Sequence, residues 1–167
     1  MAASILTVEY LRERLSYDAN TGFFTHNKDF GSRYKIGDRA DTPGHAALTG
    51  YRLVNLLNSK YLGHRAAWLH HYGAWPDGII DHINGDKSDN RIANLRDVSH
   101  QVNNENRRHK SHQNKAGFMG VLIANGRYRA RILVNRKGIH LGMFDTPEEA
   151  NEAYIEAKRI YHAGCTL

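Results

Sequence analysis

The stretch from Arg127 to Ile132 alternates arginine with Tyr128, Ala130 and Ile132. Strict alternation is the period of a β-strand, in which successive side chains point to opposite faces. One face of this strand is therefore apolar, and the other carries only the guanidinium groups of Arg127, Arg129 and Arg131. The apolar face has to be covered by another layer, so the pattern predicts a small sheet packed on one side.

The sequence around this strand supplies the missing layer. Asn125-Gly126 is a two-residue hairpin signal that joins it to an expected strand over residues 119–123. A third strand is expected over residues 139–144. A helix is expected to start at Thr146-Pro147, with proline in its first turn. The helix presents an apolar face made of Ala150, Ala153, Tyr154, Ala157, Ile160 and Tyr161.

The part of the chain before residue 110 mixes helical and strand periods, so the expected fold class is α+β. Helices are expected over residues 5–17 and 64–72 and from Ser99 to about Arg108; strands are expected over residues 23–25, 51–57, 61–63 and 79–83. The expected domains are an N-terminal helix and loop-rich region (residues 1–50), a core domain (51–109), a basic linker (110–116) and a small C-terminal domain (117–164).

Positive charge is concentrated in the middle of the chain. Residues 104–140 contain nine lysines and arginines and one acid, whereas the whole chain of 167 residues has a net charge of +6. A basic band of this kind indicates a nucleic-acid partner, although a solvated linker is the simpler alternative. Residues 103–117 lack an apolar helix face, which argues against a membrane-surface helix. With a single cysteine (Cys165) and no long apolar run near the N-terminus, the expected compartment is a reducing cytoplasm.

The segment from Asp81 to Asn103 holds the densest chemistry. Asp81 and His82 place a carboxylate beside an imidazole, and the helix expected after them offers side-chain amides, among them that of Asn103. Mg²⁺ is typically held by one or two carboxylates together with water and substrate oxygens, so Asp81 with an Asn103 amide would suffice. His82 would act as the general base. Adjacent strand residues point to opposite faces, so one shared site requires the strand to twist or end here, and an isolated Asp-His pair is more often an ordinary surface pair.

The wider segment resembles the phage and intron-encoded HNH endonucleases, which are ββα-metal nucleases of the homing type. The matching residues are His64-Arg65, Trp75-Pro76, Gly78, Asp81 to Asp86, Asp89-Asn90-Arg91, Asn94-Leu95-Arg96 and Asn103. The resemblance implies that His82 is the general base and Asp81 a metal ligand. It also implies that Asn94 braces the hairpin and orients the histidine, and that Asn103 is the second metal ligand. His100 is an alternative for that last role.

The C-terminal domain resembles the AP2 DNA-binding domain, in which three strands pack on one helix and the sheet lies in the major groove. The matching points are Phe118 to Val121, Gly126 to Ile132, Leu141 to Thr146, Glu148 to Ala150 and Ala153-Tyr154. Met119 and Leu122 replace the arginine and tryptophan that the family uses on its first strand, so the preferred bases cannot be inferred. The expected DNA-binding residues of the chain are Arg107, Arg108, Lys110, Arg127, Arg129, Arg131 and His140.

Together these features predict a monomeric endonuclease that hydrolyses phosphodiester bonds of double-stranded DNA with Mg²⁺ or Mn²⁺, as in homing. The alternative is a DNA-binding regulator that uses the same fold without cleaving. An RNA-binding protein fits less well, because the expected exposed sheet face carries arginines instead of aromatic platforms.

Overall fold

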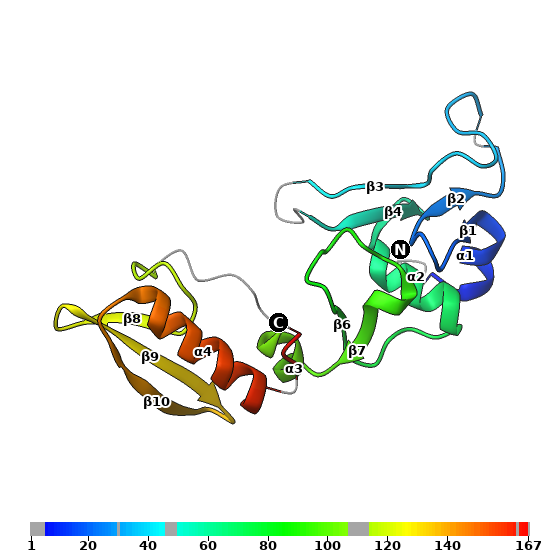
Figure 1. The fold of residues 1–167 in the computed structure, drawn as a ribbon. Coiled ribbons are helices and arrows are strands. Elements are labelled where there is room, and N and C mark those ends of the chain that lie inside the picture. The colour runs from blue at the N-terminus through cyan, green and yellow to red at the C-terminus, as the bar shows by residue number, and fades with distance from the viewer. Residues whose placement is uncertain (1–5, 30, 46–49, 107–113, 163, 167) are drawn as a thin grey trace. The chain divides into compact units, whose positions relative to one another are not determined.

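The computed structural model describes residues 6–29, 31–45, 50–106, 114–162 and 164–166, and it divides into two compact units, residues 1–98 and residues 99–167 (Figure 1). Within the described residues, no helix is long and apolar enough to cross a membrane.

The first unit is built from small antiparallel sheets around a central helix. Its elements are α1 (Val8–Arg14), β1 (Leu15–Tyr17), β2 (Phe24–His26), β3 (Asp41–Pro43), β4 (Arg52–Leu56), β5 (Ser59–Leu62), α2 (Gly63–Tyr72), β6 (Ile79–His82), the short 3₁₀ helix η2 (Ile92–Asn94) and β7 (Leu95–Val98). The strands pair as β1-β2, β3-β4-β5 and β6-β7. Helix α2 packs against α1, β1, β4, β5 and η2 and ends at Gly73, whose positive φ of 81° closes the last turn.

Residues from the beginning and from the end of this unit pack together in its core. Leu11 and Phe24 are fully buried together with Ala66 and Ala67 of α2, and Ile80 and Leu95 join them from β6 and β7. Burying a large aliphatic or aromatic side chain contributes about 1.5–3 kcal/mol. The strand pair β6-β7 is therefore held in place by segments that precede it by more than fifty residues.

Several elements of the first unit differ from the expected ones. Strand β3 lies in the region expected to be loop-rich, and η2 was not expected either. The helix expected over residues 5–17 ends at Arg14, and Leu15 to Tyr17 form β1, paired with Phe24 to His26. The hairpin buries Leu15 and Phe24, and this burial outweighs the helical spacing of the apolar residues. Strand β7 was not expected, because its four residues alternate too briefly to reveal a strand without the β6 partner.

The second unit contains α3 (His100–Glu105), β8 (Val121–Ala124), β9 (Arg127–Val134), β10 (Lys137–Phe144) and α4 (Pro147–Tyr161). The sheet order is β10-β9-β8, and α4 packs against all three strands. Ser99 caps α3 as expected, and Thr146 forms a capping box with Glu149 at the start of α4. The expected three strands and helix are thus present, although the division of the chain falls after Val98 and not near residue 109.

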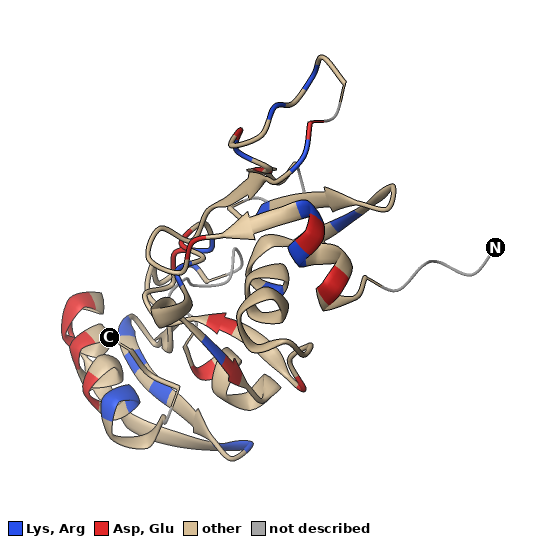
Figure 2. Cartoon of the chain, turned by 90° about the vertical axis from the view of Figure 1, so that its right-hand side faces the viewer, with Lys and Arg blue, Asp and Glu red and all other residues tan. Residues whose placement is uncertain are grey.

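The apolar face of α4 is shorter than expected. Ala150, Tyr154 and Ala157 are buried against Ala130 and Ile132 of β9. Ile160 and Tyr161, the last two expected members, are instead 68% and 48% exposed. Lys158, which is 1% exposed, continues the buried side of the helix instead. Figure 2 shows the acidic residues of α4 in red and the basic residues of the strands in blue.

Candidate functional site

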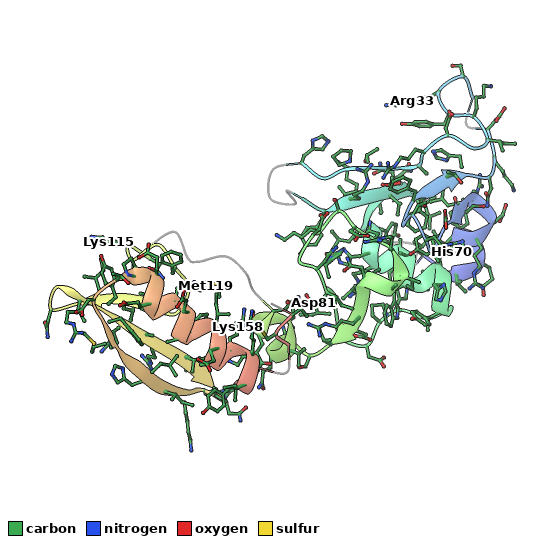
Figure 3. The ribbon with its side chains drawn as sticks, in the orientation of Figure 1. Arg33, His70, Asp81, Lys115, Met119 and Lys158 are labelled. Carbon is green, nitrogen blue, oxygen red and sulfur yellow. The ribbon has the colours of Figure 1, made fainter. Side chains whose placement is uncertain are left out.

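Asp81 and His82 are the last two residues of β6, so the strand ends at the pair, as the shared-site hypothesis required. Both side chains are buried, with 6% and 4% of their surfaces exposed. Asp81 is opposite Arg96 on β7, and its Oδ2 accepts hydrogen bonds from the Arg96 guanidinium at 2.9 Å (Nε) and 2.7 Å. Figure 3 labels Asp81. The pair is therefore an enclosed arrangement and not an ordinary surface dipeptide.

Asn90, His64 and Tyr51 lie against the ring of His82. Its Nε2 lies 3.2 Å from Oδ1 of Asn90. The His64 ring meets it edge to face at a centroid distance of 5.0 Å, and the Tyr51 ring lies 6.1 Å away. Burial lowers the pKa of His82, while the hydrogen bond with Asn90 and the charge of Asp81 act in the opposite direction. The net effect favours a neutral imidazole near pH 7, which is the form that accepts a proton.

Asn94 ties together the loop between β6 and β7. Its Oδ1 accepts a hydrogen bond from the backbone N–H of Asn84 at 2.9 Å, and its Nδ2 donates to the carbonyl of Asp89 at 2.8 Å. Its own carbonyl accepts from the N–H of Ile83. These bonds brace the hairpin. The side chain that hydrogen-bonds the His82 ring is that of Asn90, and the expected role of Asn94 in orienting the histidine stays a prediction.

Two contacts of this site were not predicted from the sequence: the hydrogen bond of Asn90 with His82 and the ion pair of Arg96 with Asp81. Asn90 was recognised only as part of a matching Asp-Asn-Arg triplet, and that triplet was the available signal. The ion pair of Arg96 with Asp81 had no signal, because it depends on the register of β6 and β7.

His64 is a buried histidine beside the site, 5% exposed, and its Nδ1 has no hydrogen-bond partner among the described residues. Burial, with smaller effects from His82 and Arg65, lowers its pKa to about 3. The folded protein therefore keeps the His64 ring neutral at pH values well below 6.5, the ordinary pKa of histidine.

This gives a prediction for the pH dependence of stability. Below pH 6.5 the unfolded chain protonates His64 and the folded chain does not, so the stability that the neutral ring contributes is lost as pH falls from 6.5 towards 3. We expect His64→Phe to make the free energy of unfolding less dependent on pH, by up to about 1.4 kcal/mol per pH unit between pH 6 and 4. Urea unfolding of both proteins at pH 8, 6, 5 and 4 measures this. Parallel curves for the two proteins would contradict the assignment.

Residues 61–105, from β5 to α3, match the model of the family described as HNH endonuclease. The match supports an HNH nuclease domain in this part of the chain. It indicates nuclease activity in general, with DNA as the substrate that the family implies. No curated protein and no solved structure matches the chain.

The donor chemistry of the HNH segment suits a hard divalent ion. Among the described residues, no cluster of three or more His, Cys, Asp or Glu side chains could hold a metal. A single carboxylate assisted by amide, water and phosphate oxygens is the pattern that Mg²⁺ uses, so Asp81 fits such an ion. Asn103, the expected second ligand, and its alternative His100 lie on α3 in the second unit. Their pairing with Asp81 stays a prediction.

The arginines of β9 lie as the alternation predicted. Ala130 and Ile132 are buried under α4, whereas Arg127 and Arg131 are exposed and Arg129 is half-buried. Arg127 donates to Asp145 at 2.7 Å, so one guanidinium already has an acidic partner. His140 is exposed opposite Arg131 on β10. The remaining expected DNA contacts, Arg107, Arg108 and Lys110, lie outside the described residues.

Proposed function

We propose that this protein is a metal-dependent endonuclease that hydrolyses phosphodiester bonds of double-stranded DNA at chosen sites, in the manner of homing enzymes. The observation that carries the proposal is His82: a buried histidine at the end of β6, next to Asp81, with its ring hydrogen-bonded to Asn90. It lies inside the segment that matches the HNH endonucleases. A base of this kind is what phosphodiester hydrolysis requires of the protein.

His82 takes a proton from the attacking water. Its burial keeps the ring neutral, and the neighbouring carboxylate of Asp81 stabilises the imidazolium that forms. Asn94 contributes by fixing the loop that carries Asn90, through its bonds to Asn84 and Asp89. The chain forms no covalent intermediate with DNA in this scheme, so its contribution is positioning and electrostatics.

Mg²⁺ or Mn²⁺ would be held by Asp81, with Asn103 or His100 as the second ligand. When bound, the ion supplies positive charge to the phosphate and to the departing 3′ oxygen. Arg96 keeps the Asp81 carboxylate oriented through its two hydrogen bonds and compensates its buried charge.

The second unit would bind DNA as an AP2-like domain. Support comes from its three-stranded sheet, covered on one side by α4, and from the arginines on the opposite side. Arg131 and Arg136, together with His162, also line a cavity of about 570 Å³ in this unit. One active site in each chain favours a monomer that nicks one strand.

The test is cleavage of supercoiled plasmid DNA by the full-length protein with Mg²⁺, with Mn²⁺ and with EDTA. We expect activity with either ion and none in EDTA. The carboxylate of Asp81 and a side-chain amide cannot by themselves supply the positive charge that the ion provides. Asp81→Asn, which keeps the shape of the side chain and removes its charge, should behave in Mg²⁺ as the wild type does in EDTA. Asp77→Asn, an exposed aspartate just before β6, is the matched control and should cleave normally.

Full activity in EDTA would show that cleavage does not depend on a metal. DNA binding without cleavage under every condition would instead support the non-cleaving regulator.

A further inference from the structure

Asn90 is one of the most enclosed polar residues of the first unit, with 1% of its surface exposed. It lies in the loop between β6 and β7, eight residues after His82, and its Oδ1 is 3.2 Å from Nε2 of the His82 ring. Its Nδ2 is buried and has no hydrogen-bond partner among the described residues. A buried polar atom without a partner is destabilising, so stability alone does not explain an asparagine here.

The position of Asn90 is fixed by segments that come from elsewhere in the sequence. The Tyr17 hydroxyl on β1 donates to the Asn90 carbonyl at 2.7 Å. Gly22 and Gly63 approach so closely that a Cβ on Gly22 would lie 2.5 Å from the Asn90 carbonyl carbon, and a Cβ on Gly63 would lie 2.8 Å from Nδ2. Asn90 thus packs closely between the turn that joins β1 to β2 and the start of α2.

We propose that Asn90 is a positioning residue that sets the tautomer of His82, placing the ring hydrogen on Nε2 and leaving Nδ1 as the nitrogen that accepts the proton from water. This inference rests on the proposed function of His82 as the base. An amide oxygen can only accept, so Nε2 must carry hydrogen, and a neutral imidazole then has its lone pair on Nδ1.

If the Asn90 side-chain amide were turned by about 180°, its hydrogen bond with His82 would be lost when His82 takes up a proton. If Nδ2 faced the ring, Nε2 would have to be the acceptor and Nδ1 would carry the hydrogen. Protonation of the ring would then set an N–H of the imidazolium against an N–H of the amide. With Oδ1 facing Nε2, the same hydrogen bond persists when Nδ1 gains its proton, and it becomes stronger because its donor is charged. The His64 and Tyr51 rings lie against the His82 ring, at centroid distances of 5.0 and 6.1 Å, and restrict the plane of that ring.

The direct test is long-range ¹H–¹⁵N NMR of the full-length protein labelled with ¹⁵N-histidine at pH 8, with the His82 signals assigned from a His82→Gln variant. We expect the wild type to show the Nε2–H form. Asn90→Leu, which is similar in size and lacks the acceptor, should show a mixture of tautomers. Asn90→Asp, which keeps an acceptor at the same place, should restore the Nε2–H form.

Kinetics on saturating DNA provide the second measurement. Asn90→Leu should lower kcat by about 10²-fold with KM almost unchanged, because the ground-state phosphate does not contact Asn90. Asn90→Asp should recover most of that loss. Leu53→Ala, a buried substitution in β4, is the control for lost stability and should leave the tautomer and kcat close to those of the wild type.

An Nδ1–H form in the wild type, or an unchanged Nε2–H form in Asn90→Leu, would overturn the inference. Equal loss of kcat in Asn90→Leu and Asn90→Asp, at equal melting temperatures, would also overturn it. The two proposals can fail separately: if the wild type cleaves no DNA, the proposed function fails, while the NMR spectra still decide how Asn90 sets the ring.

Discussion

His82→Ala is expected to lower the cleavage rate by about 10²–10⁴-fold, the usual contribution of a general base. DNA affinity should hardly change, because the base acts on water and does not bind the phosphate in the ground state. Single-turnover cleavage of a saturated substrate and a separate binding titration in Ca²⁺ measure the two quantities.

The substitution removes a ring that is only 4% exposed, so part of any loss could come from a disturbed core. His82→Gln, which fills more of the space, and a melting temperature for each variant separate the two causes. His71→Ala, an exposed histidine on α2, is the matched control and should cleave as the wild type does. Wild-type cleavage by His82→Ala would remove the residue from the mechanism.

The second large effect concerns Arg127, Arg129 and Arg131. Changing all three to alanine should weaken DNA binding strongly, and the slope of log affinity against log salt should become shallower by about 2.7 units if each contacts a phosphate. The fold should persist, because these side chains lie on the side of β9 opposite α4. Cleavage of short substrate at saturating concentration should also persist, since the proposed base lies in the first unit.

Binding titrations between 50 and 300 mM salt test this, with Arg159→Ala as a control that removes one exposed positive charge from α4 in the same unit. The control should change the slope by less than one third of the triple variant's change. If one arginine contacts a guanine edge instead of a phosphate, its single variant should lose preference at one base pair, at a cost of about 1–3 kcal/mol. An unchanged slope in the triple variant would mean that the arginine side of the sheet does not contact DNA.

Most of the second unit could be predicted, because the sequence features that specify its strands and helix lie close to them in the chain. The alternation of β9, the Asn125-Gly126 turn and the Thr146 cap each lie within a few residues of the structure they specify. The failure at Ile160 and Tyr161 has a counterpart at Lys158, a polar residue that is buried in the same turn although the apolar spacing does not include it. Helical spacing shows which side of a helix is apolar, but not which of its residues the neighbouring layer covers.

The candidate site was predictable in its residues and less so in its contacts. Asp81 and His82 could be selected from residue type and position, whereas Asn94 was selected only through the resemblance to the HNH endonucleases. The partners of the first two could not, because Arg96 reaches Asp81 through strand register, and Asn90 reaches His82 only after the loop has folded back. Neither arrangement has a periodicity that a sequence displays.

The burial of Leu11, Leu15 and Phe24 against α2 has a consequence for dividing this protein into pieces. The family match begins at residue 61, but a fragment cut there would expose the sides of Ala66, Ala67 and Leu69 that these residues cover. It would also lose Tyr17, the hydroxyl donor to the Asn90 backbone. The smallest piece suitable for crystallisation or for transfer onto another DNA-binding module therefore begins before α1, and the boundary of sequence similarity is not the boundary of the folding unit.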